Sequence, residues 1–145
     1  MYTIEQLSTM TGLTTRTLRN YLKAEILQGD KSDGIWHFSE EQVRQFVTHP
    51  SVQPSIQAKH HAIVYDFLLE RPKAQNEACV MLDLNLEAEQ AEEESSFFCE
   101  AAKDSKVFRF AYSYQEGAAR FLLKGTEPRI REILDAYSRR FQEDS

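Results

Sequence analysis

The sequence predicts an α+β fold built from two dissimilar parts. In residues 1–52, apolar residues recur at helical spacing and are interrupted by a glycine and by an Asp-Gly turn. In residues 73–145, stretches that alternate between apolar and polar residues, as strands do, are mixed with stretches of helical spacing. Residues 53–72 contain one further helical pattern. We therefore expect two small modules joined by a linking helix.

The composition is that of a globular protein, with 41% hydrophobic and 28% charged residues among 145. No run reaches the roughly 20 apolar residues of a membrane-spanning helix, and the start MYTIEQLSTM has no basic or apolar leader. We expect a cytoplasmic protein without membrane contact. Cys79 and Cys99 match no zinc-ligand spacing, and both are expected to be free thiols.

The formal net charge of −6 is unevenly distributed along the chain. Residues 1–52 hold five Lys or Arg and six Asp or Glu, whereas residues 53–145 hold the other twelve and seventeen. Screening over roughly 10 Å limits how far the acidic part acts on the first part. A local basic face in residues 1–52 could therefore still bind a phosphate backbone.

The first helix is expected to follow Thr3. Thr3 and Gln6 have the spacing of a capping box, in which two side chains satisfy backbone groups at the start of a helix. Three apolar residues then recur at helical spacing before Gly12 ends the pattern. They are Ile4, Leu7 and Met10.

A second helix is expected directly afterwards, with Thr14 as its capping residue. Leu18, Tyr21 and Leu22 fall on one stripe of this helix. Successive helical residues are about 100° apart, so four polar residues lie on the arc opposite the stripe. They are Arg16, Arg19, Asn20 and Lys23. Two short helices joined through a glycine turn, the second with a basic outer face, indicate a helix-turn-helix, whose second helix fits the DNA major groove.

The stretch ILQGDKSDGIWHF, residues 26–38, predicts a β-hairpin whose turn contains Asp33 and Gly34. Ser39 and Gln42 then repeat the capping-box spacing at the start of a third helix. The order helix, turn, helix, hairpin, helix is that of a small winged helix-turn-helix ending near residue 52. The hairpin would be its wing, with Trp36 packed on the module.

Residues 2–22, YTIEQLSTMTGLTTRTLRNYL, together with Gly34 and Phe38, resemble the N-terminal DNA-binding module of MerR-type transcription regulators. In this family the second helix typically contains Arg-Thr-Leu-Arg-Tyr-Tyr; here Asn20 replaces the first Tyr, and Tyr21 keeps the second. The family's wing usually reads Gly-Tyr-Arg-x-Tyr, whereas this chain has Gly-Ile-Trp-His-Phe. The wing arginine is missing, and we expect Lys31 to contact phosphate in its place.

Beyond residue 52 the resemblance ends, because the family usually continues into a long dimerising coiled coil. Residues 56–69 predict a linking helix of about four turns, too short for that arm. Its expected apolar residues are Ile56, Ile63, Val64, Phe67 and Leu68.

Residues 78–145 predict the element order βαββα, which resembles a ferredoxin-like unit without its last strand. The strands are expected at 78–86, 106–114 and 118–124, with a helix at 87–104 whose acidic run EAEQAEEE lies on the outer side. A right-handed crossover would pair the first strand with the third and leave an open edge. We expect the core on the aromatic face of the second strand and a last helix capped by Thr126. The aromatic face carries Phe108, Phe110, Tyr112 and Tyr114.

The residues expected to contact double-stranded DNA come from the second helix and the hairpin. Arginine and lysine side chains hold phosphates, whereas Thr15, Asn20 and Arg19 could reach base edges, because Asn pairs well with adenine and Arg with guanine. His37 is the outward residue of the hairpin. The full set is Thr14, Thr15, Arg16, Arg19, Asn20, Lys23, Lys31 and His37.

No other site chemistry is indicated by the sequence. A helix splays the adjacent His60 and His61, and no acid or cysteine lies nearby at ligand spacing. Nothing resembles an activated nucleophile or an acid–base pair. We expect no enzymatic activity, no metal site and no cofactor, and the sequence names no small-molecule effector.

Two functions follow as hypotheses. The first is a sequence-specific transcription regulator that binds operator DNA as a homodimer through residues 53–145. Its dimer contact would be either the edge strand at 78–84 or the linking helix. The second is a protein-interaction adaptor that uses the winged helix as a docking surface, in keeping with the acidic total.

Overall fold

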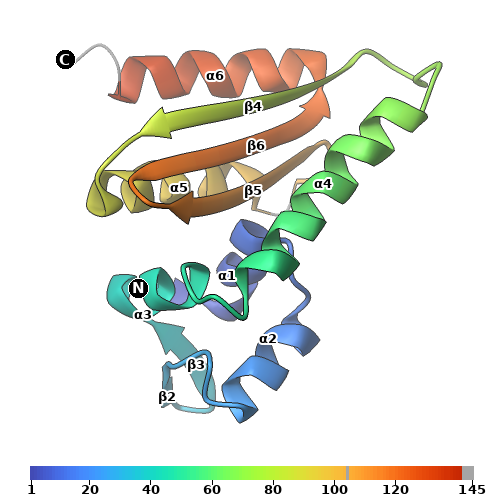
Figure 1. The fold of residues 1–145 in the computed structure, drawn as a ribbon. Helices are drawn as coiled ribbons and strands as arrows, with labels where there is room; N and C mark the ends of the chain where they lie inside the picture. The colour runs from blue at the N-terminus through green and yellow to red at the C-terminus, as the bar shows by residue number, and fades with distance from the viewer. Residues whose placement is uncertain (104, 142–145) are drawn as a thin grey trace.

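The computed structural model of the chain describes residues 1–103 and 105–141 and combines helices with two three-stranded sheets (Figure 1). Within these ranges, no helix has both the length and the apolar character needed to cross a bilayer. The elements are β1 (Tyr2–Thr3), α1 (Ile4–Thr11), α2 (Thr15–Lys23), β2 (Asp30–Ser32), β3 (Ile35–Phe38), α3 (Glu40–Val47), α4 (Gln53–Leu69), β4 (Glu77–Asn85), α5 (Ala88–Ala102), β5 (Phe108–Gln115), β6 (Ala118–Thr126) and α6 (Glu127–Phe141).

The predicted helix starts of the N-terminal part are confirmed by their hydrogen bonds. The Gln6 backbone N–H donates to Thr3 Oγ1 at 3.1 Å, and the Thr3 N–H donates to Gln6 Oε1 at 2.9 Å. Ser39 and Gln42 form the same reciprocal pair at the start of α3. Gly12 ends α1 with φ 79°, a left-handed conformation that favours glycine. The polypeptide therefore turns between α1 and α2 as the sequence indicates.

The first sheet contains the predicted hairpin and one strand that was not predicted. Strands β2 and β3 are antiparallel, and the two turn residues Asp33 and Gly34 have φ values of 53° and 77°. Strand β1 pairs with the other edge of β3, which gives the order β1-β3-β2. Because β1 has only two residues, it leaves no alternating pattern from which it could be recognised.

The second sheet has the order β4-β6-β5, and both pairings are antiparallel. The predicted pairing of the first strand with the third is therefore confirmed. Among the described residues, no strand pairs with the outer edge of β4. Strand β4, Glu77–Asn85, is therefore one edge of the second sheet, and β5 is the other.

Helices α5 and α6 cover the aromatic face of the second sheet, and α4 crosses its opposite face (Figure 1). Phe98 of α5 stacks on Phe110 of β5 at 5.3 Å and on Tyr137 of α6 at 5.0 Å between ring centroids. On the other face, Ile63 of α4 packs against small or aliphatic residues of β5 and β6. The expected aromatic core is confirmed, with Phe108, Phe110 and Tyr112 buried and Tyr114 partly buried.

A continuous core joins the N-terminal part to the second sheet. Buried side chains from α1, α3 and the start of α4 belong to the same cluster as Phe98 and Phe110. Tyr2 of β1 reaches α5, where its hydroxyl lies 2.8 Å from the Ser96 hydroxyl. The domain boundaries near residues 52 and 72 remain predictions.

The expectation that the acidic run of α5 lies on the outer side is wrong for two of its residues. Glu92 and Glu94 are each 3% exposed. Glu92 accepts hydrogen bonds from Arg44 Nε at 3.0 Å and Nη2 at 3.4 Å, and Glu94 accepts from Gln90 and from the Tyr137 hydroxyl. Because α5 packs between the N-terminal part and α6, its flanks are covered as well as its sheet-facing side. The predicted helix also included Asp104, which lies outside the described residues.

Helix α4 also differs from its predicted pattern. Ile56 and Ile63 are buried as expected, and His60, which lies between these two in the sequence, is only 1% exposed. Leu68, in contrast, is 64% exposed. Helix α4 contacts the sheet as far as Ile63 and Val64, whereas Leu68 and Leu69 in its last turn are exposed. The predicted apolar stripe is thus confirmed at Ile56, Ile63 and Val64, which packs against the second sheet, and is wrong at Leu68.

Candidate nucleic-acid interface

Helix α2 turns its polar side to solvent because its other side is anchored in the core. Leu18 is fully buried, and the ring of Tyr21 contacts that of Phe46 edge-on, at 5.4 Å between centroids. The four residues on the opposite arc are all exposed: Arg16, Arg19, Asn20 and Lys23. Figure 1 shows α2 and the β2–β3 hairpin together at the end of the molecule away from α6.

The cations of α2 have no acidic partner among the described residues. Arg16, Arg19 and Lys23 take part in none of the ion pairs seen there. Helix α2 contains no Asp or Glu. Its exposed charges are therefore free to meet an anion without first breaking an internal pair.

The two threonines at the start of α2 differ in what their hydroxyls do. Thr14 Oγ1 accepts a hydrogen bond from the Thr17 N–H at 3.1 Å and donates to Thr17 Oγ1 at 3.0 Å. Its predicted role as the helix cap is confirmed. Thr15, partly buried, is the first residue of the helix proper. The Thr15 hydroxyl, unlike that of Thr14, does not cap the helix.

The hairpin presents Lys31 and encloses a shallow hollow with α2. Lys31 Nζ lies over the Trp36 ring at 5.6 Å from its centroid, and Trp36 in turn stacks on Phe38 at 6.4 Å. Trp36 is half-buried against the module, in line with its expected packing role. The hollow, of about 310 Å³, is lined by Arg19, Leu22, Lys23 and Trp36. The structure thus brings the end of α2 next to the hairpin.

His37 lies on the opposite side of β3 from Trp36 and is half-buried, between Thr3 of β1 and Asp30 of β2 in the sheet register. The hairpin also carries acids, since residues 14–38 contain four Lys or Arg and three Asp or Glu. Two of these acids, Asp30 and Asp33, belong to the hairpin itself. The positive character of this end of the molecule therefore resides mainly in α2.

The sequence patterns of α2 and of the hairpin do not by themselves predict that Trp36 lies beside α2. The available signal was the alternation in β3, which places Trp36 and Phe38 on one face. Because Phe38 is buried, that face points toward the helices.

Residues that could serve other chemistry are placed unfavourably for it. Cys79 and Cys99 are free, and burial raises the pKa of both thiols, that of Cys99 to about 12. Both nitrogens of the buried His60 ring lack a hydrogen-bond partner among the residues that the structure describes, and burial lowers the His60 pKa to about 4. Across residues 1–103 and 105–141, no three His, Cys, Asp or Glu side chains are grouped to hold a metal ion.

Comparison with known proteins assigns the N-terminal part alone. The sequence model of the family described as MerR HTH family regulatory protein matches residues 2–48. The match covers β1 to α3, including the capped helices and the hairpin. No curated protein and no solved structure matches the chain. Residues 2–48 are therefore similar to the helix-turn-helix domain of MerR-type regulators.

Proposed function

We propose that this protein is a sequence-specific transcription regulator that inserts α2 into the major groove of operator DNA. The observation that carries the proposal is the outer face of α2, which is anchored by Leu18 and Tyr21; its cations are exposed and form no ion pair within residues 1–103 and 105–141. A MerR-type helix-turn-helix domain gives this face the setting of a recognition helix.

The residues of this face divide into two roles. Arg16, Arg19 and Lys23 neutralise phosphates, which supplies affinity but no sequence information. Asn20 lies between them and is suited to adenine, because its amide both donates and accepts. Thr15 is the other base-contacting residue. Arg19 has both roles, since its guanidinium can bind a phosphate or the edge of a guanine.

The hairpin acts as the wing in this proposal. Lys31 stands at its exposed strand and takes over the phosphate contact of the missing arginine, held in place by Trp36. His37 is the remaining wing contact, although β1 and β2 flank it in the sheet and leave it only half-exposed. The proposal assigns neither catalysis nor a cofactor to the chain.

Binding of the full chain to DNA fragments from its own genome, measured by gel shift over a range of salt concentrations, tests the proposal. With four to six phosphate contacts, log affinity should fall against log salt with a slope of about −4 to −5. Selected fragments should share a common site. If no fragment is preferred even at low salt, the protein is not a DNA regulator, and the adaptor alternative becomes the better account of the domain.

We also propose that the protein binds DNA as a homodimer, because one recognition helix contacts few base pairs. The outward face of α4 suits a second copy. Its apolar residues are exposed and follow the helical repeat on the side opposite Ile56, His60 and Ile63. They are Ala58, Ala62, Tyr65 and Leu69.

The pattern on this face is self-complementary in an antiparallel pair of α4 helices. Centring the pair between Ile63 and Val64 places Leu69 against Ala58 of the second copy, and Tyr65 against Ala62. Large side chains then meet small ones. The same register brings Lys59 near Asp66 of the second copy, and neither of them has an ion-pair partner in the described chain.

The edge of β4 is the alternative contact, where two copies would form one continuous sheet. We propose that the second part is a ferredoxin-like unit without its last strand, which the order β4-β6-β5 supports. The edge of β4 is where the missing strand would pair, so a second copy could take that place. Sedimentation of two variants of the full chain distinguishes the two contacts. Leu69→Asp should give a monomer if the dimer forms through α4, whereas Val80→Pro should give a monomer if it forms through the edge of β4. A parent protein that is monomeric at tens of micromolar contradicts both.

A further inference from the structure

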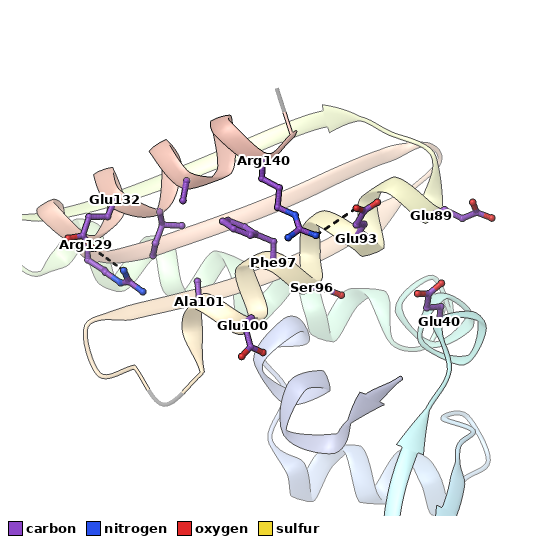
Figure 2. A pocket seen from close by; sticks show the side chains of 12 residues that line it. Glu40, Glu89, Glu93, Ser96, Phe97, Glu100, Ala101, Arg129, Glu132 and Arg140 are labelled. Carbon is purple, nitrogen blue, oxygen red and sulfur yellow. Dashed lines mark hydrogen bonds and ion pairs between the residues drawn. The ribbon is translucent and has the colours of Figure 1, made fainter. Parts of the chain in front are cut away.

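Helices α5 and α6 enclose a groove of about 770 Å³ that the proposed function does not use (Figure 2). One wall is a stripe of α5 from Glu89 to Ala101, and the other is a stripe of α6 from Arg129 to Arg140. Glu40, at the start of α3, borders one end. No residue of α2 or of the hairpin lines the groove.

The dimensions of the groove match a helix. The α5 wall spans twelve residue steps, Glu89 to Ala101, and the α6 wall spans eleven, Arg129 to Arg140, which is about 16–18 Å of helix axis. A guest helix of about three turns, lying along the two walls, would contact both over their whole length. Drug-sized ligands bind in pockets that enclose most of their surface, whereas this groove is open along one side.

The groove has an apolar floor with large and small side chains. Phe97 and Ile133 are the large ones, and Phe97 is fixed by ring contacts with Phe98 and Phe141 at 5.4 and 5.6 Å. Ala101 and Ala136 are the small ones, and they leave room for side chains of a guest. Such a floor accepts the apolar stripe of an amphipathic helix.

The rim of the groove is acidic. Its two arginines are already engaged, since Arg140 lies 3.9 Å from Glu93 and Arg129 lies 2.9 Å from Glu132. Three further glutamates line the groove without any cation paired to them in the described chain: Glu40, Glu89 and Glu100. The unpaired charge therefore selects a cationic occupant.

We infer that the α5–α6 groove binds a basic amphipathic helix of a partner protein. The apolar side of that helix packs on Phe97 and Ile133 and places aliphatic side chains over Ala101 and Ala136. Lysine or arginine residues on its flanks meet Glu89 and Glu100. This activity is independent of DNA binding, because the groove and α2 share no residue.

A displayed library of 14-residue helical peptides, with the helix-stabilising positions fixed and the others randomised, tests the inference in the absence of DNA. The full chain is the target, and peptides that also bind the Ala136→Trp variant are removed. Circular dichroism establishes that the variant is folded; if it is not, Ala101→Leu is the substitute. The selected peptides should carry apolar residues at i, i+3 or i+4, and i+7, with Lys or Arg beside them.

Binding of the selected peptides is then measured by fluorescence anisotropy. The double variant Glu89→Gln and Glu100→Gln breaks no internal ion pair and should weaken binding at least tenfold at low salt. The matched control Glu70→Gln and Glu116→Gln, which removes two exposed acids elsewhere, should leave the affinity unchanged. A peptide with the same composition in scrambled order should bind at least tenfold more weakly.

The inference is overturned if no peptide is enriched, if the enriched peptides lack a basic amphipathic pattern, or if the groove variants bind as the parent does. Displacement of bound peptides by a quaternary ammonium compound at equal concentration would also overturn it, since a small cation would then be the better occupant. None of these results depends on whether α2 binds DNA, so failure here leaves the regulator proposal intact.

Discussion

The arginines of α2 and those of α6 both lie on solvent-facing helix surfaces, yet they differ in their neighbours. On α6, Arg129, Arg131 and Arg139 each pair with a carboxylate three or four residues away. On α2, Arg16 and Arg19 have no acid on their own helix. Pairs within a helix add about 0.3–0.5 kcal/mol of stability and cancel the local charge. Helix α2 forgoes that stabilisation and keeps a positive face.

A second contrast separates the exposed cations of α2 from two buried titratable groups, Glu92 of α5 and His60 of α4. Glu92 and His60 are buried, and their charge states are linked to folding rather than to binding. The comparison therefore separates two kinds of variant. Changes on α2 should alter DNA binding without altering stability, whereas changes at the buried His60 and at the Arg44–Glu92 pair should alter stability without altering DNA binding.

The largest effect is expected when the cations of α2 are removed together. A triple variant, Arg16→Ala, Arg19→Ala and Lys23→Ala, loses three phosphate contacts, so the slope of log affinity against log salt should become shallower by about 2.7. Affinity at 50 mM salt should fall on the order of a hundredfold or more. Gel shifts over a salt series measure both quantities.

The matched control for this variant is a triple change on α6, Arg129→Ala, Arg131→Ala and Arg139→Ala. It alters the net charge by the same amount but removes only internally paired cations. Its salt slope should equal that of the parent. Equal slopes for the two triple variants would mean that net charge, and not the face of α2, governs binding.

The second effect concerns His60 and the pH dependence of stability. Burial lowers the His60 pKa to about 4 in the folded state, with smaller effects from Arg120 and His61. A depressed folded pKa gives stability that is present above the unfolded pKa of about 6.5 and is lost as pH falls toward 4. Across this range the loss should be on the order of 3 kcal/mol.

Urea unfolding at pH 7, 5.5 and 4 measures that loss. In His60→Leu the contribution of His60 is absent, so its unfolding free energy should fall less than that of the parent over the same range. His61→Leu is the control, since His61 is exposed on the same helix. Parallel pH curves for the parent and His60→Leu would show that His60 is not buried in its neutral form.

Much of the N-terminal fold could be predicted because its determinants are local. The caps at Thr3, Thr14 and Ser39 and the turn at Asp33-Gly34 act over two to three residues. The polar face of α2 followed from the same helical repeat. These features are determined by residues close in sequence, so a pattern in the sequence is enough to find them.

What could not be predicted depends on contacts between distant segments. The burial of Glu92 rests on Arg44, 48 residues earlier in the chain, and neither residue's local pattern indicates the other. His60 is enclosed because α4 lies on the second sheet, a placement that the helix pattern alone does not specify. The α5–α6 groove arises in the same way, from two helices that are separated by two strands.

The third prediction concerns the pair between Arg44 and Glu92. In Arg44→Ala the buried carboxylate loses its cation, which should lower the unfolding free energy at pH 7 by about 1–3 kcal/mol. Burial already raises the Glu92 pKa above its usual value, and Arg44 is the main opposing influence. Without Arg44 that pKa rises further, so the deficit should shrink as pH falls through the raised folded-state pKa values of the variant and the parent, which both lie above the usual glutamate pKa of about 4.3.

Chemical denaturation of Arg44→Ala at pH 7 and pH 4 tests this expectation. Arg139→Ala is the control, because its exposed pair with Asp135 should contribute about 0.5 kcal/mol or less. DNA affinity should not change in either variant. A deficit that is equal at both pH values would mean that Glu92 ionisation is not the cause.

The smallest effect is expected from Asn20, and it concerns specificity rather than affinity. Asn20 lies among the cations of α2 but carries no charge, so Asn20→Ala should leave the salt slope unchanged. If its amide reads one base, discrimination at that single position should fall by about 1–3 kcal/mol, while the other positions of the site keep their preferences. Selection of binding sites from a random DNA pool by the parent and the variant measures this directly.

Asn85→Ala, at the far end of β4, is the control and should select the parent site. Should Asn20→Ala also select the parent site at every position, the base-reading residues lie elsewhere on the face, at Thr15 or Arg19.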